Sequence, residues 1–107
     1  MRPPRVLSIA GSDSGGGAGI QADIKTITML GGYAMTAICA LTAQDTTGVQ
    51  AVVPVDPAMV AAQIDACVND LGVDAVKIGM LGSPEIAAVV AGRLESLSVP
   101  IVFDPVM

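Results

Sequence analysis

The most constraining feature of the sequence is a nine-residue segment, residues 11–19, that holds five glycines between two apolar patterns. The preceding residues 6–10 form a short apolar run, which is typical of a buried parallel strand. The following residues 18–30 have the spacing of an amphipathic helix, with one apolar face made of Ile20, Ile24, Ile27 and Leu30. This part of the chain therefore predicts a strand, a tight loop and a helix, the opening unit of an α/β fold.

The rest of the chain continues the alternation of apolar strands and amphipathic helices. Two helices are expected to begin with a capping residue followed by proline, at Asp56-Pro57 and at Ser83-Pro84. The expected strands are residues 6–10, 33–43, 49–55, 75–78 and 101–103, and the expected helices are residues 18–30, 57–71 and 84–97. This order predicts a mostly parallel sheet with helices packed on it.

Glycine and polar residues gather where the expected strands end. They occupy residues 11–19, 79–82 and 104–107, and residues 44–48 form an expected turn. In open α/β sheets, ligands bind at the carboxyl ends of the strands. The sequence therefore predicts a ligand site built from these segments.

Composition excludes several classes of function. The chain of 107 residues is 52% apolar and 14% charged, with a net charge of −5. The acidic balance and the scarcity of aromatic residues exclude nucleic acid as the expected partner. Because the sequence has no histidine, it can hold neither a Ser-His-Asp triad nor a histidine metal site. Cys39 and Cys67 lie outside any C-x-x-C motif, which indicates packed thiols and a reducing, cytoplasmic location.

One uncharged stretch, residues 26–44, approaches the length of a membrane-spanning helix. Gly31-Gly32 interrupts this stretch, and threonine side chains recur through it. We therefore expect a helix, a turn and a buried strand here, and no association with a membrane.

The glycine-rich segment allows some anion-binding motifs and excludes others. Its glycines and the following helix N-terminus could offer free N–H groups to a ligand. A P-loop is excluded because no Lys-Ser/Thr pair follows, and Asp13 takes the serine position of a nucleophile elbow. The alanine variant of the dinucleotide fingerprint is present as Gly17-x-Gly19-x-x-Ala22, with Asp45 downstream, so an NAD-binding module stays open as an alternative.

Two polar residues are candidates for direct ligand contact. Asp23 falls on the apolar side of its expected helix and therefore needs a partner, either the N–H groups of the glycine-rich loop or a ligand. Gln44 opens the expected turn, and its amide offers a donor and an acceptor side by side, which matches the edge of an aminated heterocycle.

Three further residues at strand ends have two interpretations each. Lys77 lies inside an apolar strand, so its charge needs a salt bridge or a phosphate. Met80 could form a pocket wall or part of the core. Asp104 could bind Mg²⁺, because carboxylates are hard ligands, or it could open an Asp-Pro turn.

Residues 10–23, AGSDSGGGAGIQAD, resemble the opening signature of the hydroxymethylpyrimidine/phosphomethylpyrimidine kinases of thiamine biosynthesis, which belong to the ribokinase superfamily. The resemblance continues through the whole chain, at residues 41–44, 48–49, 76–81 and 104–107. It implies a ribokinase-like, three-layer α/β/α sandwich with a mostly parallel sheet. Asp45 departs from the family, which usually has Asn at this position.

The resemblance also implies an activity and a set of site residues. The activity is phosphorylation of an aminopyrimidine alcohol and then of its monophosphate, with ATP and Mg²⁺ as cofactors and with a homodimer expected for the full-length protein. Asp104 is the candidate metal ligand, and no catalytic residue falls in this chain. The positions that carry over as pyrimidine contacts are Gly11, Ala18, Asp23, Gln44, Met80 and Val106.

The chain ends directly after an expected buried strand. We therefore expect residues 1–107 to be the N-terminal, substrate-binding part of a single domain whose nucleotide-binding part is absent. Alone, this part is expected to be inactive as a kinase and poorly soluble. Two alternatives remain beside the NAD module: a kinase acting on the related ring alcohol pyridoxal, and a non-catalytic pyrimidine-binding domain.

Overall fold

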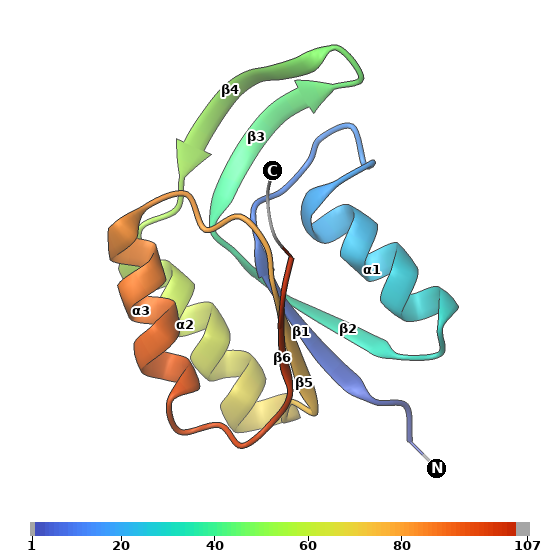
Figure 1. Ribbon diagram of the computed structural model, residues 1–107, viewed down its shortest axis with the longest axis vertical. Helices are drawn as coiled ribbons and strands as arrows, with labels where there is room; N and C mark the ends of the chain where they lie inside the picture. Colours follow the sequence, from blue (N-terminus) through green and yellow to red (C-terminus); the bar gives the residue numbers. More distant parts are fainter. Residues whose placement is uncertain (1, 105–107) are drawn as a thin grey trace.

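The computed structural model describes residues 2–104 of the chain (Figure 1). The strands are β1 (Arg5–Ala10), β2 (Tyr33–Ile38), β3 (Ala40–Asp45), β4 (Gly48–Pro54), β5 (Ala75–Ile78) and β6 (Ile101–Phe103). The helices are α1 (Gly19–Met29), α2 (Pro57–Ala66) and α3 (Pro84–Leu94), and a π-helical turn, Cys67–Leu71, follows α2.

Four strands form a parallel sheet in the order β2-β1-β5-β6. Figure 1 shows α2 and α3 on one side of this sheet and α1 on the other, which gives three layers. Both faces of β1 are therefore covered, and Leu7 and Ile9 are fully buried. They pack in one core with Val60 and Ile64 of α2. The apolar run of residues 6–10 arises from this burial on both faces.

The expectation of one continuous strand over residues 33–43 is wrong. The chain leaves the parallel sheet at Cys39, where the backbone N–H still donates to the Ala10 carbonyl at 2.9 Å. Beyond Ala10, the β1 segment turns into the glycine-rich loop and offers no further strand to pair with. The residues after Cys39 instead pair antiparallel with β4 and form a separate two-stranded sheet, the β3–β4 hairpin.

The hairpin also shortens the expected turn at residues 44–48. Gln44 and Asp45 belong to β3, so only two residues separate the paired strands. The Asp45 carboxylate accepts the Thr47 N–H at 2.8 Å and closes this turn. All seven residues of β4, residues 48–54, are exposed, which confirms the expectation of a more exposed strand here, although the expected range was 49–55.

The expected helix caps are confirmed. The Asp56 carboxylate accepts the Ala58 N–H at 2.8 Å, and the Ser83 hydroxyl accepts the Ile86 N–H at 3.1 Å. The second helix is α-helical only to Ala66, and the π-helical turn carries the chain on to Gly72, whose φ is +81°. Within residues 2–104, the structure contains no helix long and apolar enough to cross a membrane.

Candidate functional site

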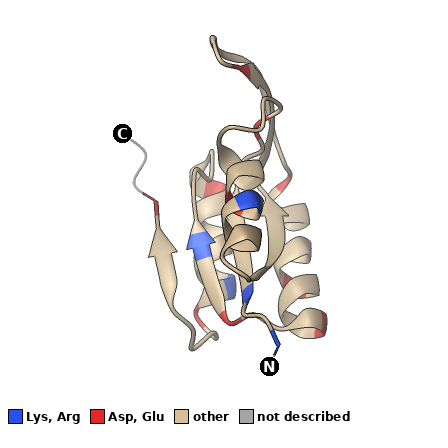
Figure 2. Cartoon of the chain, turned by 90° about the vertical axis from the view of Figure 1, so that its right-hand side faces the viewer, with Lys and Arg blue, Asp and Glu red and all other residues tan. Residues whose placement is uncertain are grey.

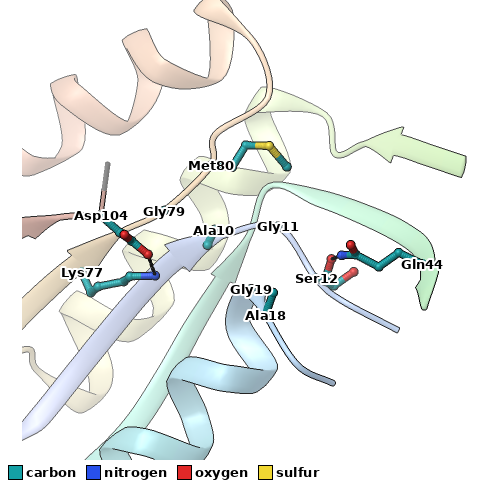
Figure 3. A pocket seen from close by; sticks show the side chains of 10 residues that line it. All are labelled: Ala10, Gly11, Ser12, Ala18, Gly19, Gln44, Lys77, Gly79, Met80 and Asp104. Carbon is teal, nitrogen blue, oxygen red and sulfur yellow. Dashed lines mark hydrogen bonds and ion pairs between the residues drawn. The ribbon is translucent and has the colours of Figure 1, made fainter. Parts of the chain in front are cut away.

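A pocket of about 240 Å³ opens where β1 and β5 end, at the edge of the sheet that the sequence predicts for ligands. Three loops, the first turn of α1 and strand β3 meet there (Figure 3). We call it the acceptor pocket. Its lining consists of Ala10, Gly11, Ser12, Ala18, Gly19, Gln44, Lys77, Gly79, Met80 and Asp104.

Asp13 fixes the glycine-rich loop from inside. Asp13 is 6% exposed, and its carboxylate accepts the N–H groups of Gly15, Gly17 and Ala18 at 2.8, 2.9 and 2.7 Å. The loop therefore carries its own anion, and these N–H groups are not free for a ligand. This closure takes away the basis of a dinucleotide fingerprint at Gly17. The expectation that Asp23 binds the N–H groups of the loop is therefore wrong, because Asp13 binds them.

Two glycines in the lining are required by close approach of the backbone. Gly19 has a φ of +59°, and a Cβ atom there would collide with the Gly11 carbonyl oxygen. A Cβ atom at Gly79 would lie 2.9 Å from the Ala10 Cβ. A side chain at either position would force these segments apart, so the glycines let the segments that line the pocket pack closely together.

The loop and the β3–β4 hairpin are joined by side-chain hydrogen bonds. The Ser14 hydroxyl donates to the Gln44 carbonyl at 2.6 Å and accepts the Gln44 N–H at 2.8 Å. The Ser12 hydroxyl accepts the Thr42 N–H at 3.1 Å, and the Thr42 hydroxyl donates to the Ser12 carbonyl at 2.7 Å. These contacts place β3 beside the pocket, although it belongs to a different sheet.

Gln44 reaches the pocket from β3, and not from a turn as the sequence suggested. Figure 3 shows its carboxamide pointing toward Ser12. Its Nε2 donates to the Thr42 hydroxyl at 3.1 Å and to the Ser12 carbonyl at 3.4 Å. These bonds orient the amide, so that its oxygen can accept an N–H group from a ligand.

Asp23 does not line the pocket but binds a residue that does. Its side chain is 16% exposed and accepts the Ser8 hydroxyl at 2.7 Å and the Lys77 ammonium at 2.9 Å. Lys77 also lies 3.5 Å from the Asp104 carboxylate. The salt-bridge interpretation of Lys77 is thus confirmed, and the sequence assigns neither of its two partners.

Most of the predicted contact residues meet in the acceptor pocket. Gly11, Ala18, Gln44 and Met80 all line it, and Met80 is 49% exposed, which makes it a wall of the pocket and excludes the core interpretation. Val106 lies outside the described residues.

Sequence reasoning did not select Ser12, Gly19 and Gly79 as contacts, although they line the pocket too, and it left Lys77 open between a salt bridge and a phosphate. Their shared signal was available in the sequence, since each lies in or next to an expected strand end or the glycine-rich loop. What was missing is the direction of the Ser12 side chain and the close approach of the backbone at Gly19 and Gly79, which depend on the packed fold.

Asp104 does not form a metal site with the other described residues. Its side chain is 61% exposed and its nearest charged neighbour is the Lys77 ammonium, which repels a divalent cation. Within residues 2–104, no three Asp, Glu, Cys or His side chains are grouped so that they could hold a metal ion. Mg²⁺ usually takes one or two carboxylates together with phosphate oxygens and water. Asp104 alone therefore does not fit Mg²⁺.

The sequence matches proteins of one family. The family model described as phosphomethylpyrimidine kinase matches residues 13–107. A hydroxymethylpyrimidine/phosphomethylpyrimidine kinase of Mycobacterium bovis is 59% identical, over 99% of this chain and 39% of the relative. The thiamine biosynthesis bifunctional protein ThiED of Geobacter sulfurreducens is 54% identical, over 95% of this chain and 21% of the relative. The chain thus spans about two fifths of the Mycobacterium bovis protein.

Solved structures share the fold. A crystal structure of phosphomethylpyrimidine kinase from Clostridium difficile 630 is 48% identical with a TM-score of 0.93, over 97% of this chain and 46% of the other. The pyridoxal kinase of Staphylococcus aureus, solved with pyridoxal, is 37% identical with a TM-score of 0.89, over 100% of this chain and 41% of the other. The expectation of a ribokinase-like α/β fold is confirmed.

Proposed function

Because the chain belongs to the phosphomethylpyrimidine kinase family, we propose that it binds the acceptor in a kinase that phosphorylates hydroxymethylpyrimidine and then its monophosphate. The single observation that carries this proposal is the acceptor pocket, where four of the six predicted pyrimidine contacts meet. The relatives named as kinases of these two pyrimidines support it.

The chemistry of the pocket suits an aminated aromatic ring. The oriented amide of Gln44 offers an acceptor for an exocyclic amino group. Gly11 and Gly19 present backbone without side chains to the pocket, and the polarizable Met80 side chain lines its wall. A flat ring bonded at one edge by an amide is held in one orientation, which sets the direction of its hydroxymethyl group.

Phosphoryl transfer forms a bond from the acceptor oxygen to the γ-phosphorus and breaks the bond from that phosphorus to ADP. The acceptor proton needs a base, and the proposal assigns no residue of 2–104 to that role. We place the nucleotide and the base in the remainder of a longer protein, with residues 1–107 as the N-terminal part of one domain. ATP is the proposed donor, and kinases of this fold solved with AMP-PCP or ADP support it.

The remaining expectations stay predictions. They are that residues 1–107 alone are inactive and poorly soluble, that Mg²⁺ accompanies ATP, and that the full-length protein is a cytoplasmic homodimer. The contact of Asp23 with the pyrimidine is a prediction too, and the structure suggests that any effect of Asp23 passes through Lys77.

Pyridoxal is the second candidate acceptor. The observation that favours it is the similarity to pyridoxal kinases of the same fold, including the Staphylococcus aureus protein solved with pyridoxal. Pyridoxal has no ring amino group, so Gln44 would contribute less to its binding.

The test compares two glutamine variants of the full-length protein. Gln44→Ala removes the pocket amide, and Gln50→Ala is the matched control because Gln50 lies on the exposed part of the hairpin. In calorimetry, Gln44→Ala is expected to weaken hydroxymethylpyrimidine binding by roughly 1–3 kcal/mol, the cost of an unpaired polar group. Gln50→Ala should bind like the unmodified protein. Turnover of pyridoxal but of neither pyrimidine would contradict the proposal.

A further inference from the structure

The acceptor pocket has two chemically different ends. Figure 3 shows Gln44 and Ser12 at one end and the Lys77–Asp104 ion pair at the other, with the glycines and Met80 between them. Among the described residues that line the pocket, Lys77 is the one basic side chain. A ring that places its amino edge on Gln44 therefore extends toward a cation.

The two carboxylates that pair with Lys77 are unequal. Asp23 is 2.9 Å from the ammonium, is 16% exposed and is itself held by the buried Ser8 hydroxyl at 2.7 Å. Asp104 is 3.5 Å away and 61% exposed. Its backbone N–H is fixed to the Ile78 carbonyl, but its carboxylate lies largely in water, where ion pairs contribute little. Asp23 is therefore a permanent partner and Asp104 a replaceable one.

Space around the ammonium is provided by a glycine. A Cβ atom at Gly79 would lie 3.3 Å from the Lys77 Nζ, which is tight enough to crowd it. An ammonium has three donor positions, and the two carboxylates occupy two of them. A phosphate oxygen could bind the third position or displace Asp104, in either case with a charge-assisted hydrogen bond.

We propose that Lys77 recognises the phosphate of the phosphorylated acceptor, with Asp104 as its counterion while the acceptor is still a neutral alcohol. This inference rests on the proposed function and adds a specificity residue to it. Exchange of Asp104 for phosphate keeps Lys77 paired in both states. One pocket can then accept both a neutral alcohol and its charged monophosphate.

The experiment measures binding of the two pyrimidines to the full-length protein by calorimetry, without nucleotide or metal. Lys77→Met is expected to weaken phosphomethylpyrimidine binding about 10- to 100-fold, because a hydrogen bond to a charged group is lost. Binding of hydroxymethylpyrimidine should change less than about threefold. Lys25→Met is the matched control, since Lys25 bonds the Gly16 carbonyl on the outer face of the loop, and should alter neither affinity.

Asp104→Asn is expected to change the affinity for phosphomethylpyrimidine in the direction opposite to Lys77→Met. Removal of the competing carboxylate is expected to tighten phosphomethylpyrimidine binding by about two- to fivefold and to leave the neutral alcohol unchanged. Asp104 is exposed, so this variant decides the matter if Lys77→Met does not fold. A purely structural role of Lys77 would weaken both ligands alike.

Three results would overturn the inference. Lys77→Met could weaken the affinity for both pyrimidines equally, or weaken neither affinity, or Asp104→Asn could leave the affinity for phosphomethylpyrimidine unchanged. If the proposed function itself is wrong, the unmodified protein binds neither pyrimidine. The two kinds of failure can therefore be told apart.

Discussion

The parallel sheet and the β3–β4 hairpin are built from similar residues and end in opposite environments. Strand β1 contains valine, leucine, isoleucine and alanine, and strand β4 contains three valines and an alanine. Leu7 of β1 is fully buried, whereas Val52 and Val53 of β4 are 50% and 61% exposed. Figure 2 shows the hairpin projecting beyond the layers of helix and sheet. An apolar composition therefore favours a strand, but the neighbouring layers decide its burial.

The two regions also differ in what holds them. The sheet is held by burial between α1 on one face and α2 with α3 on the other. The hairpin is attached through hydrogen bonds of Ser12 and Ser14 to Thr42 and Gln44. The same bonds place Gln44 in the acceptor pocket. The less buried region thus supplies a site residue, as is common for segments positioned by a rigid scaffold.

The largest expected effect separates core burial from exposed apolar residues. In urea denaturation of the full-length protein, Leu7→Ala should lower the free energy of unfolding by about 3–5 kcal/mol, because it leaves a cavity in the core. Val53→Ala on the hairpin should cost less than about 1 kcal/mol, since the side chain is mostly in water. Similar losses in the two variants would break the comparison and would mean that the hairpin is covered in the full-length protein.

The next effect compares two aspartates that bind backbone N–H groups. Asp13→Ala removes a buried side chain that accepts three N–H groups and should cost roughly 2–4 kcal/mol. Asp45→Ala, at the exposed hairpin turn, should leave the melting temperature nearly unchanged. Thermal unfolding followed by circular dichroism measures both variants. A larger shift for Asp45→Ala would show that the hairpin contributes more to stability than its exposure indicates.

A smaller effect is expected on acidification. The Arg5 side chain holds the pKa of Asp74 at about 2, below its usual 3.8. A lowered folded-state pKa stabilises the protein above the unfolded value, and this contribution is lost as the pH falls from about 4 toward 2. Asp74→Asn should therefore show a smaller loss of melting temperature over this range. An unchanged acid dependence in Asp74→Asn would contradict this origin.

The hairpin has its own acid-sensitive contact. The hydroxyl of Thr47 is the main cause that lowers the pKa of Asp45, by donating to its carboxylate. Protonation of Asp45 should therefore loosen only the turn. A lower protection of the Thr47 amide at low pH, measured relative to its intrinsic exchange rate and without global unfolding, is the expected observation, and Asp45→Asn should abolish this pH dependence of the protection.

The smallest effect is expected from a chemical probe of the junction of the two regions, which compares the reactivity of two thiols. Cys39 is fully buried where β2 gives way to β3, and burial raises the pKa of its thiol to about 11. At neutral pH this leaves roughly a hundredfold less thiolate than a normal cysteine has. The half-buried Cys67 should react first with an alkylating reagent, identified by mass spectrometry. Rapid labelling of Cys39 would show that the junction opens readily.

Much of the sheet could be predicted from neighbouring residues. The strands at 75–78 and 101–103 coincide with β5 and β6, and both proline-following caps form as expected. The meeting of Gly11 and Met80 in one pocket follows from the rule that parallel strand ends share an edge, because they follow β1 and β5. Gln44 does not follow from this rule, because it reaches the pocket from β3 of the other sheet. The break at Cys39 was not predictable from residues 33–43, because their apolar pattern is continuous.

The sequence by itself determined the local elements, since apolar periodicity, capping side chains and glycine conformations depend on residues a few positions apart. Only the tertiary structure decided which polar groups meet. Lys77 binds Asp23 across 54 residues of chain, a choice that depends on how α1 packs on the sheet. Asp13 is the exception, because it closes the glycine-rich loop over only two to five residues of sequence. A short-range pattern shows that a charge needs a partner, but distance in the folded chain selects which one.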